Sequence, residues 1–378
     1  MALTASLNGL RIGLIGPLPP PAGGMANQTR QLAELLGGRQ AQVQLVQTNA
    51  PYRPAWVGQV PLARAVFRLL PYLLQLWRAS GSSDVLHIMA NSGWSWHLFA
   101  APAIWVARLR HTPVVVNYRG GEAEGFLARN RRLVGWSLKQ SARIIVPSGF
   151  LKAVFASQGL AADVVPNIID LARFHPADMP SGASAGESAA GPHVLVARNL
   201  EPIYDNATAL HAFAQVHQHC PEARMTIAGT GPQEAELRQL AQQLGIAEAV
   251  HFSGRLDRDE MAALLRHSSV ALNPSLVDNM PNSVLEALAS GVPVVSTHVG
   301  GVPHIVQDGV TALLVPPRDA AAMAAALLQV ITDTALADRL ARAGLQEVQR
   351  YTWDRVAPQW AAVYDAAVAR RAQGVAAS

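Results

Sequence analysis

Short runs of continuously apolar residues recur along the first half of the chain, and stretches with helical spacing separate them. The runs are Arg11–Ile15, Val43–Val46, Val85–Met89, Val114–Asn117 and Ile144–Pro147. Runs that are apolar throughout, without strict alternation, are typical of parallel strands covered by helices on both faces. This half of the chain therefore predicts a doubly wound α/β domain.

The same arrangement returns in the second half. Its runs are His193–Ala197, Met225–Ala228, Val250–Ser253, Val270–Asn273, Val294–Ser296 and Leu313–Val315. Residues 176–192 are rich in Pro, Gly, Ser and Ala, which indicates a linker. A chain of 378 residues is also long for one core. We expect two Rossmann-like domains facing each other across a cleft, residues 1–175 and 193–354, with the C-terminal helix 355–378 packing back on the first.

Two carboxylates, those of Asp278 and Glu286, lie eight positions apart around the expected start of a helix. Pro281 and Gly291 mark its two ends, because proline suits a first turn and glycine commonly follows a last one. The N–H groups at a helix N-terminus attract phosphate, and the carboxylate of Glu286 can accept hydrogen bonds from a ribose diol. Taken alone, the pair is more simply explained as a helix cap and a solvated glutamate.

Three other places could bind an anion or a sugar. Gly23 and Gly24 follow the first strand and allow close approach of the backbone to a phosphate, although a plain turn explains them as well. Arg198 directly follows a strand and could neutralise a departing diphosphate, or could be a surface or domain-stabilising arginine. Arg119 could act electrostatically on a sugar or acceptor, or could form an ion pair with Glu122 or with Glu124.

The motif around the two carboxylates resembles the signature of retaining, nucleotide-sugar-dependent glycosyltransferases of family 4, which have the GT-B fold. The matching residues are Pro274-Ser275, Asp278, Pro281, Leu285-Glu286-Ala287, Gly291-Val292-Pro293 and Gly300-Gly301. The resemblance extends over nearly the whole chain and is strongest from about Ala228 to Pro317.

The resemblance implies a donor site in the second domain. There Asp278 would contact the hydroxyls of the donor sugar, and Glu286 would bind the ribose. Gly23 and Gly24 would reach across the cleft to the donor phosphate. We assign catalytic roles to Asp278, Arg198 and Arg119. The other residues that we assign to donor binding are Tyr204, Gly231, Arg255, Leu256, Asn279, Met280, Pro281 and Asn282.

The chain departs from the family pattern at three places. Asp278 stands where the family usually has a glutamate, and Arg119-Gly120 stand where a histidine-glycine pair is frequent. The lysine that family members commonly place about five residues after the arginine is missing after Arg198. Tyr204 or Asn206 could donate a hydrogen bond there instead, without the charge.

We therefore expect an enzyme that moves a sugar from a nucleotide sugar to a glycan or lipid-linked acceptor, in cell-surface polysaccharide or glycolipid biosynthesis. Two alternatives stay open: a nucleotide-sugar epimerase on the same fold, and a non-catalytic nucleotide-sugar-binding partner of another transferase. We expect no cofactor besides the nucleotide sugar, and no metal, since no Asp-x-Asp motif lies beside the proposed phosphate site.

Composition bounds the partners and the location. The formal charge is +4, and no run of Lys and Arg with interleaved aromatics indicates nucleic acid. The single cysteine, Cys220, suits a reducing cytoplasm, and the N-terminus lacks a signal-peptide pattern. The segment Ala55–Trp77 is apolar with interspersed arginines, so it is either a core helix or a helix lying on a membrane. We expect a cytoplasmic protein with possible peripheral contact to the inner face of the membrane.

Overall fold

The computed structural model describes residues 7–20, 23–52, 60–177 and 191–376. The chain divides into two compact units: unit 1 contains Met1–Ile168 and Trp353–Ser378, and unit 2 contains Ile169–Thr352. The first boundary falls earlier than the expected residue 175. Most of the expected linker, 176–192, lies outside the described residues, as do residues 55–59 of the apolar segment.

Unit 1 is built on a six-stranded parallel sheet with the strand order β2-β1-β3-β4-β5-β6. Its strands are β1 (Arg11–Gly16), β2 (Gln42–Gln47), β3 (Val85–Ala90), β4 (Val114–Tyr118), β5 (Arg143–Val146) and β6 (Asp163–Val164). Each apolar run expected in this half forms a strand. The edge strand β6 was not predicted, because two residues carry too little pattern to be recognised.

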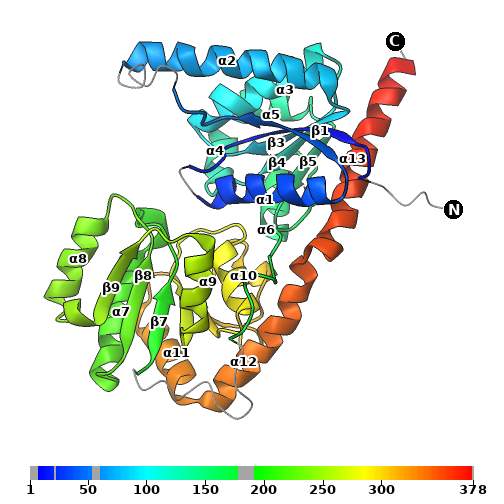
Figure 1. Ribbon diagram of the computed structural model, residues 1–378. Helices are drawn as coiled ribbons and strands as arrows, with labels where there is room; N and C mark the ends of the chain where they lie inside the picture. Colours follow the sequence, from blue (N-terminus) through cyan, green and yellow to red (C-terminus); the bar gives the residue numbers. More distant parts are fainter. Residues whose placement is uncertain (1–6, 21–22, 53–59, 178–190, 377–378) are drawn as a thin grey trace. The chain divides into compact units, whose positions relative to one another are not determined.

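Helices cover both faces of this sheet (Figure 1). They are α1 (Gly24–Gly38), α2 (Pro61–Ser82), η2 (Trp96–Ala100), α3 (Ala101–Leu109), α4 (Ala123–Arg129), α5 (Arg131–Leu138), α6 (Gly149–Ser157) and α13 (Trp353–Ala376). Leu36 of α1 and Trp360 of α13 belong to the core on one face, whereas Leu76 of α2 and Ile104 of α3 belong to the core on the other. The last helix of the chain thus completes the core of the first unit.

Unit 2 is also built on a six-stranded parallel sheet, with the strand order β12-β11-β10-β7-β8-β9. Its strands are β7 (His193–Val196), β8 (Arg224–Ala228), β9 (Val250–Gly254), β10 (Val270–Asn273), β11 (Val294–Thr297) and β12 (Leu313–Val315). Its helices are η3 (Pro202–Tyr204), α7 (Asn206–His219), α8 (Glu234–Gln243), η4 (Ala247–Ala249), α9 (Arg258–Arg266), α10 (Asn282–Ala289), η5 (Val302–His304), α11 (Ala320–Thr332), α12 (Thr334–Glu347) and η6 (Val348–Tyr351). The two parallel sheets confirm the predicted α/β fold class.

Candidate active site

The strand order of unit 2 determines where polar side chains meet. The chain runs from β7 through β8 to β9 on one side of the sheet, and then returns to β10 on the other side of β7. The carboxyl ends of β7 and β10 therefore lie side by side at a topological switch point, with Val194 opposite Val270. In doubly wound sheets, ligands bind in the crevice beside such a point.

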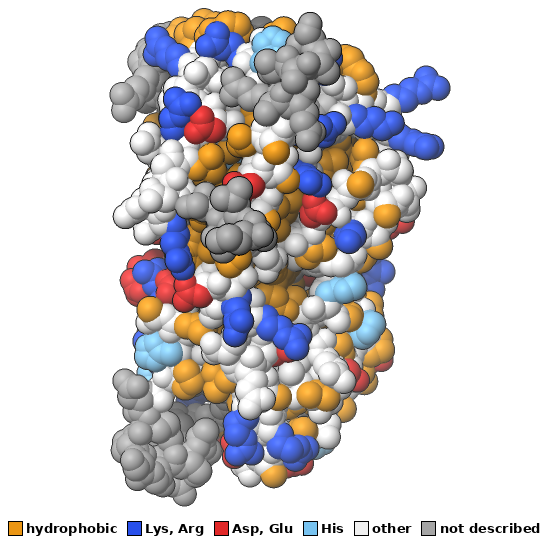
Figure 2. Space-filling view, turned by 90° about the vertical axis from the view of Figure 1, so that its right-hand side faces the viewer, with side chains coloured by type: hydrophobic (Ala, Val, Ile, Leu, Met, Phe, Trp, Pro, Cys, Tyr) orange, Lys and Arg blue, Asp and Glu red, His pale blue; other side chains and the backbone are white. Residues whose placement is uncertain are grey.

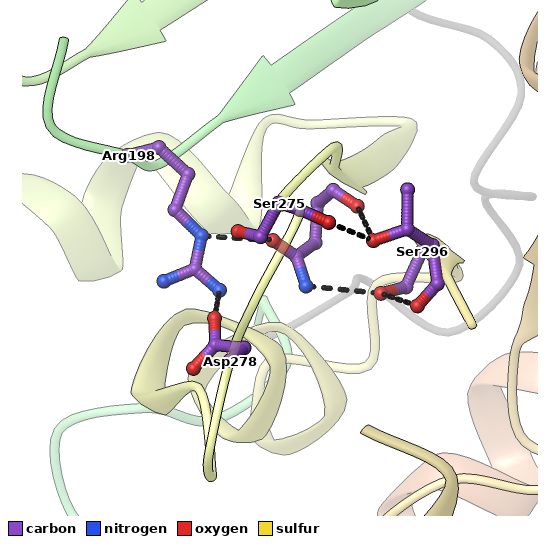
Figure 3. A network of polar contacts seen from close by, with 6 residues as sticks. Arg198, Ser275, Asp278 and Ser296 are labelled. Atoms are coloured by element: carbon purple, nitrogen blue, oxygen red, sulfur yellow. Dashed lines mark hydrogen bonds and ion pairs between the residues drawn. The ribbon is translucent and has the colours of Figure 1, made fainter. Parts of the chain in front are cut away.

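Arg198 follows β7 and bonds to Asn273, the last residue of β10, and to Asp278 in the loop that follows β10. Its Nε donates to Oδ1 of Asn273 at 2.8 Å, and its Nη2 lies 2.5 Å from Oδ2 of Asp278. Figure 3 shows the guanidinium of Arg198 pointing toward the carboxylate of Asp278. The predicted diphosphate ligand and the predicted sugar contact are thus brought together as one ion pair.

A second layer of hydrogen bonds fixes Asn273. Its Nδ2 donates to Oγ of Ser296 at 2.9 Å, and Oγ of Ser275 donates to its Oδ1 at 2.7 Å (Figure 3). The hydroxyl of Thr297 donates to the carbonyl of Ser275 at 2.6 Å. Sequence reasoning missed all these residues as supports for Arg198. The available signal was a polar residue at the end of each apolar strand, since Asn273, Ser296 and Thr297 end β10 and β11.

The ion pair is nearly withdrawn from water. The side chains of Arg198 and Asp278 are only 11% and 13% exposed. Burial raises the pKa of Asp278, and the neighbouring Arg198 opposes that rise. A helix cap would direct the carboxylate of Asp278 to the amides of α10, but it binds Arg198 instead. The residue before the helix is Pro281, which makes no side-chain cap.

Glu286 lies within α10 and is also partly buried. Burial raises the pKa of its carboxyl to about 7, while the positive charges of Arg258 and Arg198 favour ionisation. A glutamate on an exposed helix face would not show such a shift, so the structure argues against a solvated surface role. Arg258, which sequence reasoning missed, also lies 3.7 Å from Asp170 and stacks over Phe174.

The turn of α10 is built as its sequence predicts. The helix starts directly after Pro281, ends at Ala289 and is followed by Gly291 with φ +69°. The backbone at Gly300 lies against the loop that contains Asp278. Only a glycine fits there, because a Cβ would lie 2.1 Å from the carbonyl oxygen of Asp278. Asn279 and Met280 are buried beside the helix N-terminus, and Asn282 is partly buried.

Three predicted donor-binding residues lie in neighbouring loops of unit 2. A Cβ on Gly231 would lie 2.3 Å from the carbonyl oxygen of Leu200, so close packing alone requires a glycine there. Arg255 is exposed, and its Nη2 lies 3.5 Å from Oγ1 of Thr230. Leu256 packs against the core that contains α10.

In the segment where the lysine is missing, an aromatic ring lies against Arg198. The guanidinium of Arg198 lies 5.3 Å from the ring centroid of Tyr204. Asn206 instead is buried and donates from Nδ2 to the carbonyl of Asn199 at 3.0 Å. Of the two residues that could replace the lysine, the structure thus brings Tyr204, and not Asn206, into contact with Arg198.

The chain does contain one Asp-x-Asp spacing, Asp257 and Asp259, next to Leu256. Oδ1 of Asp257 accepts hydrogen bonds from the amides of Asp259 and Glu260, which makes it the cap of α9. Oδ1 of Asp259 pairs with Nε of Arg173 at 3.1 Å. Both carboxylates thus have structural partners, and no group of three or more metal-binding side chains occurs in the described part of the chain.

The remaining predicted residues belong to unit 1. Gly23 precedes α1, and a Cβ on Gly23 or Gly24 would meet no described atom within 4 Å, so packing within the described residues does not account for the glycines. Arg119 follows β4 and is partly buried. Its Nε donates to Asn117 at 2.9 Å, and its Nη1 donates to Gln28 at 3.2 Å and also to Asn167. Burial lowers the pKa of Arg119 to about 10, so the guanidinium stays charged at neutral pH.

Comparison with known proteins decides the family. A model described as Glycosyltransferase Family 4 matches residues 22–173, and one described as Glycosyl transferases group 1 matches residues 191–333. A glycogen synthase of Mycobacterium tuberculosis is 33% identical over 286 residues, which are 71% of this chain and 67% of that protein. This chain belongs to glycosyltransferase family 4. It is therefore a glycosyltransferase enzyme.

Three further similarities extend over nearly the whole of this glycosyltransferase. A phosphatidyl-myo-inositol mannosyltransferase of Mycobacterium leprae is 29% identical over 378 residues, covering 94% of this chain and 96% of the relative. The structure of a sucrose-phosphate synthase from Thermosynechococcus elongatus covers 98% of this chain and all of its own, with a TM-score of 0.72 and 22% identity. Anabaena HepE with UDP and glucose covers 94% of this chain and 99% of its own, with a TM-score of 0.72 and 18% identity. These structures show that the fold is GT-B.

Proposed function

We propose that this enzyme transfers a sugar from a nucleotide-sugar donor to a glycan or lipid-linked acceptor, with retention of anomeric configuration. The observation that carries the proposal is the partly buried group of Arg198, Asp278 and Glu286 near the switch point of unit 2. The mannosyltransferase and glycogen synthase relatives support a sugar acceptor or a lipid-linked acceptor. Their range of acceptors fits cell-surface polysaccharide or glycolipid biosynthesis in the cytoplasm as the role of this enzyme.

Arg198 would stabilise the departing diphosphate. Two of its nitrogens bind Asn273 and Asp278, and Nη1 remains to donate to a phosphate oxygen. The N-terminal amides of α10 would supply further donors beside the same charge. Negative charge grows on the diphosphate as the sugar develops oxocarbenium character, so donors fixed in advance lower the barrier. Since these groups provide the charge that a divalent cation would otherwise provide, we propose transfer without a metal or other cofactor.

Glu286 and Asp278 would hold the two sugars of the donor. The carboxylate of Glu286 would accept hydrogen bonds from the ribose hydroxyls, which requires its ionised form. Asp278 would accept from hydroxyls of the transferred sugar, and its pairing with Arg198 would link sugar binding to diphosphate binding. Tyr204, stacked on the guanidinium, would restrict the orientation of Arg198 without adding charge.

A thermal-shift screen with UDP-, GDP-, ADP- and dTDP-sugars tests donor binding. The true donor should raise the unfolding temperature of the wild type and have a clearly smaller effect on Glu286→Ala. Equal shifts in the two proteins would contradict the ribose assignment. Glu236→Ala, which removes an exposed glutamate of α8, is the matched control.

Product analysis with the identified donor separates transfer from the alternatives. Transfer needs an acceptor, should give a product with the donor's anomeric configuration, and should continue in the presence of a chelator. Conversion of the donor without any acceptor would indicate an epimerase. Binding without transfer to any acceptor of a broad panel would indicate a non-catalytic partner, and inversion or loss of activity with the chelator would contradict the corresponding part of the proposal.

A further inference from the structure

Helix α2 of unit 1 is apolar on both sides. Tyr72 and Leu76 point into the core and are 3% and 0% exposed. On the opposite side, Leu70 and Leu74 are 57% and 54% exposed, and Trp77 is 47% exposed. A helix at the surface of a soluble domain normally turns polar residues outward. The inner side agrees with the interpretation of the segment Ala55–Trp77 as a core helix. Packing in the core does not explain why the outer side is apolar.

The apolar surface continues from α2 onto the end of α3. Leu109 is 69% exposed, and the guanidinium of Arg110 lies 4.8 Å from the ring centroid of Trp77. Arg78, the residue after Trp77 in α2, is also exposed. We call these six residues, Leu70, Leu74, Trp77, Arg78, Leu109 and Arg110, the outer α2 face. In Figure 1, α2 forms the outermost layer of unit 1. In Figure 2, hydrophobic side chains lie beside Lys and Arg side chains at the top of the view.

The part of the sequence that contains the outer α2 face is strongly basic, although Arg39 in it pairs with Asp354 and Arg119 bonds to Asn117. Residues 35–121 contain a single acid, Asp84, which pairs with Arg11 at 2.6 Å. The same stretch contains eight arginines: Arg39, Arg53, Arg64, Arg68, Arg78, Arg108, Arg110 and Arg119. Leucine and tryptophan side chains beside arginines suit the boundary between lipid headgroups and acyl chains, where the rings and aliphatic stems enter the lipid and the guanidinium groups meet phosphates.

We propose that the outer α2 face docks the enzyme on an anionic lipid bilayer. A second copy of the chain fits the surface less well, since each face would bring its arginines against those of the other. The proposal rests on the proposed function in one respect only. Docking would bring unit 1 to the membrane where a lipid-linked acceptor resides.

Vesicle flotation tests docking without any nucleotide sugar, so its result does not depend on transfer. The full-length protein is mixed with vesicles of phosphatidylcholine alone, or with about 30% phosphatidylglycerol. We expect flotation with the anionic vesicles, weak flotation with the neutral ones, and release when salt rises from about 50 to about 300 mM. Absence of flotation with the anionic vesicles would overturn the proposal, even if the purified enzyme transfers sugar normally.

Variants locate the binding surface. Arg78→Gln with Arg110→Gln should lower the partition coefficient about tenfold or more, because each arginine contributes to attraction by anionic lipid. Leu70→Gln with Leu74→Gln should also lower it. The matched controls in unit 2, Arg339→Gln with Arg342→Gln and Val310→Gln, remove exposed residues of the same kinds and should bind as the wild type does.

Two results would contradict the assignment of this face. One is equal loss of flotation in the face variants and the controls, measured on proteins with unchanged unfolding temperatures. The other is a wild-type dimer in sedimentation that Leu70→Gln with Leu74→Gln converts to a monomer, which would make the face an interface between copies.

Discussion

Arg198 and Asp278 illustrate how a residue can serve stability and binding at once. Both side chains are largely buried, and each provides the counter-charge of the other. Removing one partner of such a pair leaves an uncompensated charge in a poorly solvated place, which is more harmful than removing both. Stability and catalysis can therefore be separated by comparing single and double variants.

Arg198→Leu should lower the free energy of unfolding by about 3 kcal/mol, because it leaves Asp278 charged and unpaired. The double variant Arg198→Leu with Asp278→Asn should recover much of that loss, since no charge remains buried. Urea unfolding of the wild type, both single variants and the double variant measures the coupling. Additive effects in this cycle would show that the pair contributes little to stability. Transfer should be lost in every variant that lacks Arg198.

Glu286 should make stability depend on pH. Its pKa in the folded protein is about 7 and its ordinary value is 4.5, so between these values the folded state holds a proton that the unfolded chain has released. The stability that this carboxyl contributes is complete below pH 4.5 and is lost as pH rises to about 7. Glu286→Gln, which cannot ionise, should therefore be more stable than the wild type at about pH 8 by roughly 2 kcal/mol.

Urea unfolding at about pH 8 and about pH 4 checks this expectation, because the two proteins should be about equally stable at the lower value, where the wild-type carboxyl is also neutral. Glu236→Gln controls for the loss of a negative charge. A difference between Glu286→Gln and the wild type that does not change with pH would contradict the buried-carboxyl explanation.

The sequence indicated that Arg198 and Asp278 are candidate site residues, but it did not indicate that they form an ion pair with each other. Arg198 and Asp278 each follow the end of an apolar run, a local feature that can be read from the chain. Their contact depends on β10 lying next to β7 in the sheet, although β8 and β9 come between these two strands in the sequence. Strand order is a property of the whole sheet, so spacing along the chain could not predict it.

At the scale of elements, α13 is tied to the sheet of unit 1 by a buried polar contact. The hydroxyl of Tyr364 lies 2.8 Å from Nδ1 of His87, and Nε2 of His87 lies 3.0 Å from Nδ2 of Asn117. Burial and the charge of Arg119 lower the pKa of His87 to about 3, which keeps the ring neutral at physiological pH. Nothing in the sequence indicated this role for His87, because the residue stands inside an apolar run.

Tyr364→Phe should lower the free energy of unfolding by about 1 to 3 kcal/mol, because it leaves a buried nitrogen of His87 without its hydrogen bond. Chemical denaturation followed by circular dichroism measures the change. Tyr204→Phe is the control, since the hydroxyl of Tyr204 has no hydrogen bond within the described residues and only its ring contacts Arg198. Equal effects of the two substitutions would show that the contact to His87 is not what stabilises α13.

At the scale of the molecule, each unit has its own sheet and its own core. This much could be predicted, because apolar runs and helical spacing are local and occur twice. The roles of Gly23 and Gly24 are a different matter. They belong to unit 1, whereas Asp278 and Glu286 belong to unit 2, so a shared donor site requires a relation between units that no local pattern encodes.

Hydrogen exchange with and without the identified donor tests that relation. Donor binding should protect the amides of residues 278–286, because the phosphate and the ribose would contact the start of α10. If Gly23 and Gly24 also contact the phosphate, the amides of residues 23–28 at the start of α1 should be protected over the same range of donor concentrations. Glu286→Ala should need more donor for both effects. Protection confined to unit 2 would contradict the assignment of Gly23 and Gly24 while leaving that of Glu286 intact, and protection confined to α1 would contradict the donor site in unit 2.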